Sequence, residues 1–416
     1  MRVRIHRGAH EIGGSCVEVA SRHDRIVLDV GKPLWAKWNE DVPLPPIPGL
    51  AGDSDPSLVG VVISHPHLDH YGLCDQINSS VPIVIGREAA NLLRAATFFS
   101  AAGRELRPSH YLADRAPLSL GDFSVTPYLA DHSAFDAYSL LVEADGQRLF
   151  YTGDIRGHGR KARLFQRLID DPPRTIDVLL CEGTHIRSSD LSDDVPRTEV
   201  DVEHSLARRM SDIKGTVLVV SSAQNIDRLV SVYRACKRTG RILVTDLYTA
   251  TIAAATGRST IPQPGFPGFS VYVPNRQRVL VKEAKEFDRI EQVRSCRVFQ
   301  EWLVTNRSRI TLLMPSSAAP ELARSGALAG GGVVWSMWPG YLHEDSGKRF
   351  QELLQSEGIP LMVDHTSGHA SVADLQRLAV ALDARRVIPI HTEGADRYHE
   401  IFSTVELHGD GEWWDV

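Results

Sequence analysis

The sequence predicts an α/β protein built from two kinds of domain, and three observations lead to this prediction. The chain has 416 residues, which is enough for two or three domains of ordinary size. Residues 1–185 carry many short strand-like segments and few helices. Beyond Thr184, apolar strands alternate with helical stretches, which is the βαβ pattern of a parallel sheet.

Short strands dominate the first part of the chain. Apolar runs predict strands at Met1–Arg7, Cys16–Ala20, Arg25–Asp29 and Gly60–Ser64. The first long helical pattern covers Arg87–Phe98. Two alternating strands then flank Asp145-Gly146, a dipeptide typical of a hairpin turn, and "TIDVLLCEGTH" predicts one more buried strand.

Helices and parallel strands dominate the second part. The segment "GTVLVVSSAQNIDRLVSVYRACKRTGRILVT" predicts a strand, a helix and a strand, with apolar residues of the helix at helical spacing. The runs "RITLLMPSS", "GGVVWSMW" and "IPLMVD" predict further short buried strands. The Pro/Gly-rich stretch 260–275 predicts an exposed connection.

Composition excludes several classes of protein. Hydrophobic residues make up 43% of the chain and charged residues 24%, as in ordinary globular proteins. The formal net charge of −6 argues against a protein that coats nucleic acid nonspecifically, although it leaves a nuclease possible because an active site works by its local field. Five dispersed cysteines, no apolar signal segment and no membrane-length apolar run predict reduced thiols, no membrane association and a cytoplasmic location.

The densest chemical signal is "SHPHLDH", which follows the predicted strand Gly60–Ser64. In extended backbone His65 and His67 point the same way, and a turn or helix start would bring Asp69 and His70 to the same cavity. Imidazole and carboxylate ligands together suit zinc, manganese or iron. Four such side chains so close together predict a site for two neighbouring ions, against the alternative of a solvated histidine-rich turn.

Strand ends downstream add further candidates. His132 in "YLADHSAFDAYS" and Asp154 in "LFYTGDIRG" each follow a predicted strand. Taken singly, either is as well explained as a capping, surface or turn residue. Their order after the histidine motif favours metal binding.

These motifs together resemble the metallo-β-lactamase superfamily. "CEGTH" with Glu182, "SGHA" with His369 and "IPIHTEG" with His391 are similar to the three additional motifs of its β-CASP branch, which holds nucleic-acid hydrolases such as ribonuclease J and the cleavage-and-polyadenylation endonuclease. The resemblance implies an αββα sandwich with an inserted β-CASP domain of parallel sheet and helices. It places the sandwich at residues 1–185 and 361–416 and the inserted domain at residues 186–360.

The resemblance also implies a set of site residues and two divalent metal ions, zinc or alternatively manganese. The implied metal ligands are His65, His67, Asp69, His70, His132, Asp154 and His391, with Asp154 shared. Asp69, Glu182 and His369 are the implied catalytic residues, in which Glu182 orients His369 as general acid. His365, Ser367 and the backbone of Gly368 are the implied binding site for the scissile phosphate.

The implied function is a metal-dependent ribonuclease for single-stranded RNA, which leaves 5′-phosphate and 3′-hydroxyl ends and acts as a 5′ exonuclease, an endonuclease or both, with a homodimer as one compatible assembly. Two cations that activate a hydroxide, and a histidine that protonates the leaving oxygen, suit phosphodiester hydrolysis. Three alternatives stand beside it: a DNA nuclease of the same branch, a small-ester or lactone hydrolase on the same scaffold, and a non-catalytic partner subunit. His391 disfavours DNA, because DNA-repair members carry valine at this position.

Some features leave the subfamily open. The Glu of "CEGTH" is similar to the polyadenylation-type enzymes, whereas "SGHA" is closer to ribonuclease J, and "GAHEIGG" has fewer glycines than relatives usually show. Arg156, Arg160 and Lys161 are candidates for a phosphate path or a solvated basic loop. Three tryptophans are candidates for base stacking or for the core, and these are Trp302, Trp335 and Trp338.

Overall fold

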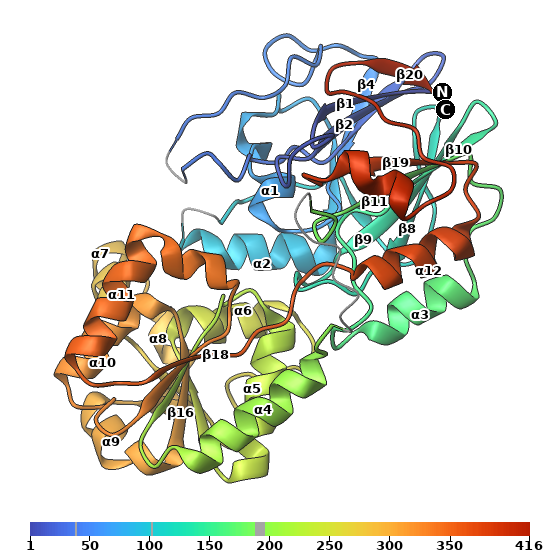
Figure 1. The fold of residues 1–416 in the computed structure, drawn as a ribbon. Coiled ribbons are helices and arrows are strands. Elements are labelled where there is room, and N and C mark those ends of the chain that lie inside the picture. Colours follow the sequence, from blue (N-terminus) through green and yellow to red (C-terminus); the bar gives the residue numbers. More distant parts are fainter. Residues whose placement is uncertain (38–39, 101–102, 188–195) are drawn as a thin grey trace. The chain divides into compact units, whose positions relative to one another are not determined.

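A computed structural model describes residues 1–37, 40–100, 103–187 and 196–416. The chain separates into two compact units, residues 1–196 with 368–416 and residues 197–367. The first unit contains two mixed sheets and the second an all-parallel sheet with helices (Figure 1). The predicted α/β fold class is therefore confirmed, while the boundaries 1–185, 186–360 and 361–416 stay a proposal.

The first sheet of the first unit has the strand order β20-β1-β2-β3-β4-β5-β6 in the described part of the chain. Its strands are β1 (Arg2–Arg7), β2 (Cys16–Ala20), β3 (Arg25–Leu28), β4 (Leu58–Val62), β5 (Ile83–Gly86), β6 (His110–Leu112) and β20 (Trp413–Asp415). β3 to β6 run parallel, whereas β1, β2 and β20 pair antiparallel.

The second sheet has the order β19-β11-β10-β9-β8-β7 over the same described residues. Its strands are β7 (Leu118–Leu120), β8 (Phe123–Leu129), β9 (Tyr138–Ala144), β10 (Gln147–Tyr151), β11 (Val178–Glu182) and β19 (Arg386–Ile390). The β9–β10 hairpin turns at Asp145 and Gly146, both with positive φ, as the sequence predicts. β8, β10, β11 and β19 all point the same way, because β8 and β10 both pair antiparallel with β9 while β10, β11 and β19 pair parallel.

Apolar side chains of the two sheets face each other in one core. Val19 and Val62 from the first sheet share a buried cluster with Val142 and Ile388 from the second. Helices cover the outer faces: α2 (Arg87–Thr97) packs on the first sheet, and α3 (Ala162–Asp170) and α12 (Val372–Leu382) pack on the second. The layers are therefore helix, sheet, sheet and helix, which is the expected αββα sandwich.

The second unit is a parallel sheet with the order β15-β14-β13-β16-β12-β17-β18 among the described residues. Its strands are β12 (Val217–Val220), β13 (Ile242–Thr245), β14 (Phe269–Tyr272), β15 (Arg297–Val298), β16 (Ile310–Met314), β17 (Gly332–Trp335) and β18 (Leu361–Val363). Its helices are α4 (Glu199–Asp212), α5 (Ile226–Thr239), α6 (Leu247–Ala255), α7 (Asn275–Ala284), α8 (Asp288–Glu291), α9 (Gln300–Thr305), α10 (Ala319–Arg324) and α11 (Asp345–Ser356). This arrangement is consistent with the predicted β-CASP insertion.

One sequence expectation about this unit needs correction, and the structure separates the three candidate tryptophans. The stretch 260–275, predicted as an exposed connection, contains strand β14, whose Phe269, Val271 and Tyr272 are buried. Proline and glycine mark the turn before this strand. They hide the short apolar pattern of its four residues, which pair with β13 and β15. Trp335 is buried in the core and Trp302 packs against it, whereas Trp338 is exposed.

Two further properties concern the helices and the cysteines. No helix within the described residues has the length and apolarity required to cross a bilayer. All five cysteines are free thiols, and four of them are buried.

Candidate metal centre

The candidate site residues of the first unit lie where strands end. His65 follows β4, His132 follows β8, Asp154 follows β10 and His391 follows β19, and Glu182 is the last residue of β11. Because β8, β10, β11 and β19 point the same way, their carboxyl ends meet at one edge of the sheet. Residues more than 300 positions apart in sequence therefore come together.

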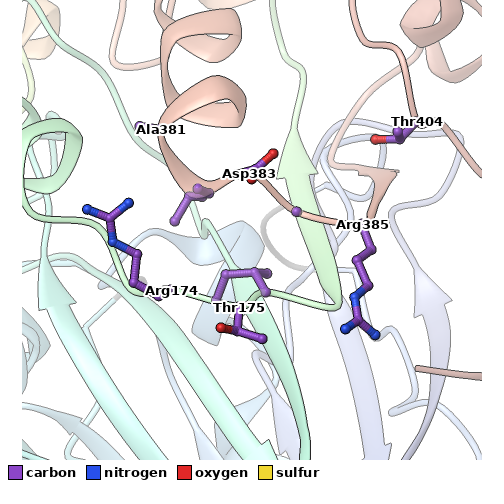
Figure 2. Close-up of a pocket in the computed structure, with 9 residues that line it drawn as sticks. Arg174, Thr175, Ala381, Asp383, Arg385 and Thr404 are labelled. Carbon is purple, nitrogen blue, oxygen red and sulfur yellow. The ribbon is translucent and has the colours of Figure 1, made fainter.

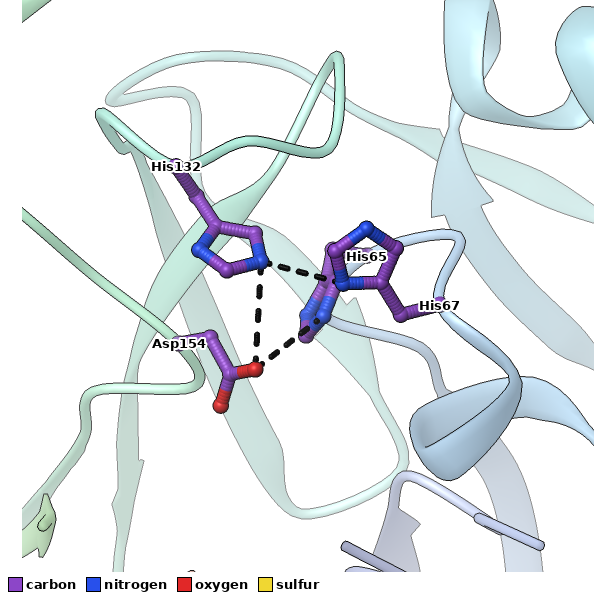
Figure 3. Close-up of side chains that lie close together, drawn as sticks. All are labelled: His65, His67, His132 and Asp154. Carbon is purple, nitrogen blue, oxygen red and sulfur yellow. Dashed lines mark hydrogen bonds and ion pairs between the residues drawn. The ribbon is translucent and has the colours of Figure 1, made fainter. Parts of the chain in front are cut away.

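The first cluster contains His65, His67, His132 and Asp154 (Figure 3). Asp154 Oδ2 lies 3.5 Å from His65 Nε2 and 3.8 Å from His132 Nε2. His132 Nε2 lies 3.1 Å from His67 Nδ1. His67 therefore presents its Nδ1 to the point where His65 and His132 present their Nε2 atoms. Three imidazole nitrogens and one carboxylate oxygen thus converge on a space the size of an ion.

The second cluster contains Asp69, His70, Asp154 and His391. The short helix α1 (Leu68–Tyr71) begins directly after His67 and turns Asp69 and His70 towards Asp154, as the sequence predicts. Asp154 Oδ1 lies 3.3 Å from His70 Nε2 and 3.8 Å from His391 Nε2. Asp69 Oδ2 completes the set, 3.8 Å from His391 Nε2.

The two clusters share Asp154 and fit a binuclear metal site. One carboxylate oxygen faces the first cluster and the other faces the second, which is how a carboxylate bridges two ions. Both oxygens of Asp154 are buried without a hydrogen-bond partner, as are the Nε2 atoms of His65, His70 and His391. Buried polar atoms without partners are costly, and a bound cation would satisfy all of them.

Protonation states in the first cluster suit metal binding, whereas His70 of the second cluster shifts the other way. Burial lowers the pKa of His65 and His132 well below the usual value and that of His67 to about 4, so these imidazoles keep free lone pairs at neutral pH. Burial alone raises the pKa of Asp154, but the surrounding imidazoles outweigh it and hold this pKa well below its usual range. Burial lowers the pKa of His70, yet the carboxylates of Asp154 and Asp29 outweigh burial and raise it.

Asp29, which the sequence argument did not select, organises ligands of both clusters. Its Oδ2 accepts hydrogen bonds from His70 Nδ1 at 2.8 Å, Ser64 Oγ at 2.7 Å and Tyr151 Oη at 2.8 Å. Ser64 Oγ in turn lies 3.0 Å from His65 Nδ1. Asp29 directly follows β3, so the strand-end placement that drew attention to Asp154 was also the available signal here.

Two other histidines, His132 and His391, are also held through their second ring nitrogen. His132 Nδ1 lies 2.5 Å from the carbonyl oxygen of Gly368, and His391 Nδ1 lies 3.0 Å from Ser15 Oγ. Fixing one ring nitrogen determines how the other faces a metal. His391 and Asp29 have φ values of 55° and 59°, a left-handed backbone that is uncommon outside glycine and often stored at functional sites.

Glu182 and His369 form a pair beside the clusters. His369 Nδ1 lies 3.4 Å from Glu182 Oε2, 3.8 Å from Asp154 Oδ2 and 3.0 Å from Thr184 Oγ1. The buried carboxylate of Glu182 also accepts hydrogen bonds from the backbone N–H groups of Thr184 and Ala370. Burial lowers the pKa of His369, but Asp154 and Glu182 outweigh it and raise this pKa to about 9. Thr184 was not among the predicted site residues.

Comparison with known proteins identifies the domain that holds this site. A family model described as a beta-lactamase superfamily domain matches residues 25–220. The chain carries a metallo-β-lactamase superfamily domain. The match includes the "SHPHLDH" motif, His132, Asp154 and Glu182, which are ligands or neighbours of the paired clusters.

Distant homology extends over most of the chain. Ribonuclease J of Sinorhizobium meliloti is 22% identical over 380 residues, which cover 85% of this chain and 61% of that protein. Ribonuclease J of Mycolicibacterium smegmatis is 23% identical and covers 94% of this chain and 68% of that protein. An RNase J-like protein of Methanocaldococcus jannaschii is 27% identical, covering 59% and 58% respectively. The chain thus spans about three fifths of the length of the first and third relatives.

A solved structure shows the same fold over the whole chain. A protein of unknown function from Enterococcus faecalis matches with a TM-score of 0.81, 18% identity and 99% coverage of both chains. At this identity the likeness establishes the fold alone. Together, the metallo-β-lactamase domain and its paired His/Asp clusters support a metal-dependent hydrolase as the class of function.

The implied phosphate-binding residues lie between β18 and α12 of the chain. His365 and Ser367 end the second unit, and their role stays a prediction. Gly368 begins the returning part of the metallo-β-lactamase unit, and its carbonyl holds the metal-ligand candidate His132. A Cβ at Gly368 would lie 2.6 Å from Ser133 Oγ and 3.2 Å from His132 Cε1, so any side chain there would force Ser133 to shift and would press on His132.

The basic residues after Asp154 do not form a solvated loop. Arg156 is fully buried, and its Nε lies 3.6 Å from Asp131 Oδ1. Lys161 Nζ donates a hydrogen bond to the carbonyl oxygen of His132 at 2.9 Å. The sequence offered a phosphate path or a solvated loop for this segment, whereas these two side chains hold the loop that carries His132.

A hollow of about 540 Å³ lies at the opposite edge of the second sheet, before β11 and β19 begin (Figure 2). Residues labelled around it are Arg174, Thr175, Ala381, Asp383, Arg385 and Thr404. Arg385 is paired with Asp177 at 3.0 Å. None of the candidate ligands lines this hollow, so the chemistry of the metallo-β-lactamase domain belongs to the carboxyl edge.

Proposed function

We propose that this protein is a metal-dependent ribonuclease that hydrolyses phosphodiester bonds and leaves 5′-phosphate and 3′-hydroxyl ends. The observation that carries the proposal is the pairing of His369 with the buried carboxylate of Glu182 beside the paired metal clusters. Ester and lactone hydrolysis on this scaffold needs the clusters but not this pair. Distant homology to proteins named ribonuclease J supports RNA as the substrate.

The seven predicted ligands would hold two ions, zinc or manganese, and Asp154 would be shared between them. When bound, such ions supply an activated hydroxide and neutralise the charge of the phosphate oxygens. The ligand Asp69 and the general acid His369 are less deeply buried than His65, His70, His132 and Asp154, because 14% and 20% of their side chains remain exposed. These two side chains therefore face the side from which a substrate enters.

His369 would give a proton to the leaving 3′ oxygen. Glu182, Thr184 and Asp154 all lie near its Nδ1, and the proton transferred in this proposal is the one on Nε2. Its raised pKa keeps the imidazole protonated at neutral pH, the state that a general acid requires. Such a group typically contributes about 100- to 10,000-fold to the rate.

The phosphate-binding role of His365, Ser367 and Gly368 belongs to the same proposal. All three lie within a few residues of His369, on the segment that joins the second unit to α12. Because His369 directly follows Gly368 in the chain, a phosphate held by these residues would lie near the general acid. Substitution of Ser367 by alanine would test this role through KM for RNA.

Incubation with labelled substrates tests the proposed function. Protein loaded with zinc or manganese is mixed with 5′-labelled single-stranded RNA, DNA of the same sequence, and a lactone, with Asp154→Asn as the inactive control. We expect cleavage of RNA and little of the others. A mononucleotide from the 5′ end indicates an exonuclease and internal fragments an endonuclease. Hydrolysis of the lactone alone, or of no RNA at all, would overturn the proposal.

A further inference from the structure

An exposed tryptophan lies on the turn that flanks the second metal cluster. We propose that Trp35 stacks on a nucleobase of RNA bound at the metal centre, so that this indole selects a base-bearing substrate and sets its position. The inference rests on the proposed ribonuclease function and adds to it a residue that recognises the substrate.

The exposure of Trp35 is the first observation. Its side chain is 67% exposed, more than any other Trp, Phe or Tyr in the described part of the chain, and its neighbour Leu34 is 60% exposed. An indole buries a large apolar area when it is covered, so leaving it in water forgoes a substantial stabilisation. Aromatic faces held in solvent beside a site are typical of ligand recognition.

The second observation is that the indole is held in place. Trp35 Nε1 donates a hydrogen bond to Glu11 Oε2 at 3.2 Å. The turn closes through a hydrogen bond from the Ala36 N–H to the Pro33 carbonyl, and Pro33 forms a β-bridge with Gly13. A ring fixed in this way loses little conformational entropy when a flat partner covers it.

The third observation is the distance from this turn to the ligands. A point where a Cβ of Gly13 would stand lies 2.7 Å from Leu34 Cγ and 3.2 Å from Asp69 Oδ2, a ligand atom of the second cluster. The backbone nitrogen of Gly13 lies 3.3 Å from His391 Nδ1. Gly13 has a φ of 84°, and its missing side chain lets the Leu34–Trp35 turn approach Asp69.

The chemistry of the surroundings favours a base over a phosphate on this ring. Among the described residues, the indole N–H donates to the carboxylate of Glu11, which repels a phosphate but not an uncharged base. Every nucleobase has an aromatic face, so stacking on tryptophan binds single strands with little sequence preference. A small ester or lactone offers no such face.

A base-deletion experiment on the metal-loaded full chain tests the inference. Single-stranded RNAs each carry one ribose without a base, at successive positions around the cleavage site, and kcat and KM are measured for each. Stacking on an aromatic ring is worth roughly 5- to 150-fold per base. Wild-type protein should lose about that factor in kcat/KM, mainly through KM, when one particular base is missing.

The Trp35 variants give the deciding comparison. Trp35→Ala should lose a similar factor on intact RNA and should no longer distinguish intact RNA from the RNA that lacks that base. Trp35→Phe, which keeps an aromatic face, should retain most of the discrimination. Trp413→Ala is the matched control, because Trp413 lies on edge strand β20 beneath Arg4.

The outcomes separate the inference from the function beneath it. If active wild type and Trp35→Ala suffer equal losses at every base-free position, the stacking role is wrong, while the proposed ribonuclease function stands. If Trp413→Ala abolishes the discrimination as fully as Trp35→Ala, the effect is not specific and the inference fails. A wild-type protein that cuts no RNA overturns the proposed function and this inference with it.

Discussion

Asp29 shows how much of the site depends on a residue outside the two ligand clusters. Its carboxylate receives the Nδ1–H of His70 directly and fixes His65 through Ser64, so it orients one ligand from each cluster. It also accepts the Ser64 backbone N–H at 2.7 Å. Four donors converge on two oxygens, and an amide in the same place would turn one acceptor into a donor.

We therefore expect Asp29→Asn to weaken metal binding about 10- to 100-fold, the usual effect of losing a partner behind a ligand. Competition with a chromogenic chelator would measure the affinity. Asp145→Asn is the matched control, because Asp145 also has a left-handed backbone but lies at the exposed hairpin turn. Equal affinity in Asp29→Asn and wild type would contradict the role assigned to Asp29.

His369 should act without binding metal. His369→Ala is expected to retain both ions and to hydrolyse RNA at least about 100-fold more slowly, because the leaving oxygen loses its proton donor. Metal analysis and single-turnover kinetics on the same preparation measure the two effects. Loss of an ion from this variant would make His369 a ligand instead.

Glu182→Gln should change the pH profile in a defined direction. The Glu182 carboxylate raises the pKa of His369, so an amide there lowers this pKa. A general acid must be protonated, so activity falls as pH rises through its pKa. The alkaline limb of kcat should therefore move to lower pH in Glu182→Gln, and an unmoved limb would show that His369 is not the group that titrates.

At the scale of elements, the loop between β8 and β9 is anchored to helix α2. Asp136 in this loop accepts hydrogen bonds from the Ala89 N–H at 3.0 Å and from Tyr138 Oη at 2.8 Å. A Cβ at Gly86 would lie 2.2 Å from Asp136 Oδ2, so the helix start and the carboxylate are in direct contact. The contact with α2 therefore holds in place the loop that carries His132.

Burial, with Glu88 nearby, raises the pKa of Asp136 from 3.8 to about 6. Because the folded-state pKa is the higher one, the stabilisation from the protonated form is present below about pH 3.8 and is lost as pH rises through about 6. Asp136→Asn tolerates the left-handed backbone and cannot titrate. The melting temperature of Asp136→Asn minus that of wild type should therefore be larger at pH 7 than at pH 4.5. A constant difference across this range would refute the shift.

Elements also show where sequence patterns succeed and fail. Strands β1 to β4 and helix α2 were predicted to within a few residues. The strands line the core between the two sheets, and α2 packs on the outer face of the first sheet, so each has a regular apolar pattern. β14 was missed, because four residues between proline-rich turns carry too short a pattern. Arg156 was misjudged because its partner Asp131 lies 25 positions earlier, in another loop.

For the whole molecule, metal binding and stability should be linked. The paired clusters bring five imidazoles and two carboxylates together in the interior of the first unit, with buried ligand atoms that have no other partner. Ions that bind the folded state alone stabilise it by mass action. Removal of metal with a chelator should therefore lower the melting temperature, and zinc should restore it.

Stoichiometry gives this expectation a sharper form. Wild type should hold two ions per chain, and Asp69→Ala about one, because Asp69 belongs to the second cluster only. Asp154→Asn removes the shared ligand and should lose most of the thermal response to zinc. Two tightly bound ions in Asp69→Ala would contradict the two-cluster assignment.

The sequence by itself determined the α/β class, most strands, and the local motif from His65 to His70, because these depend on periodicity and on neighbours a few residues apart. Motif order also selected His132 and Asp154, and the resemblance to the β-CASP motifs selected Glu182, His369 and His391. Only the tertiary structure decided that one oxygen of Asp154 faces each cluster, that Asp29 supports both, and that the Trp35 turn flanks Asp69. Such contacts join residues from separate strands and loops, and their distances depend on how the two sheets pack, which no local pattern records.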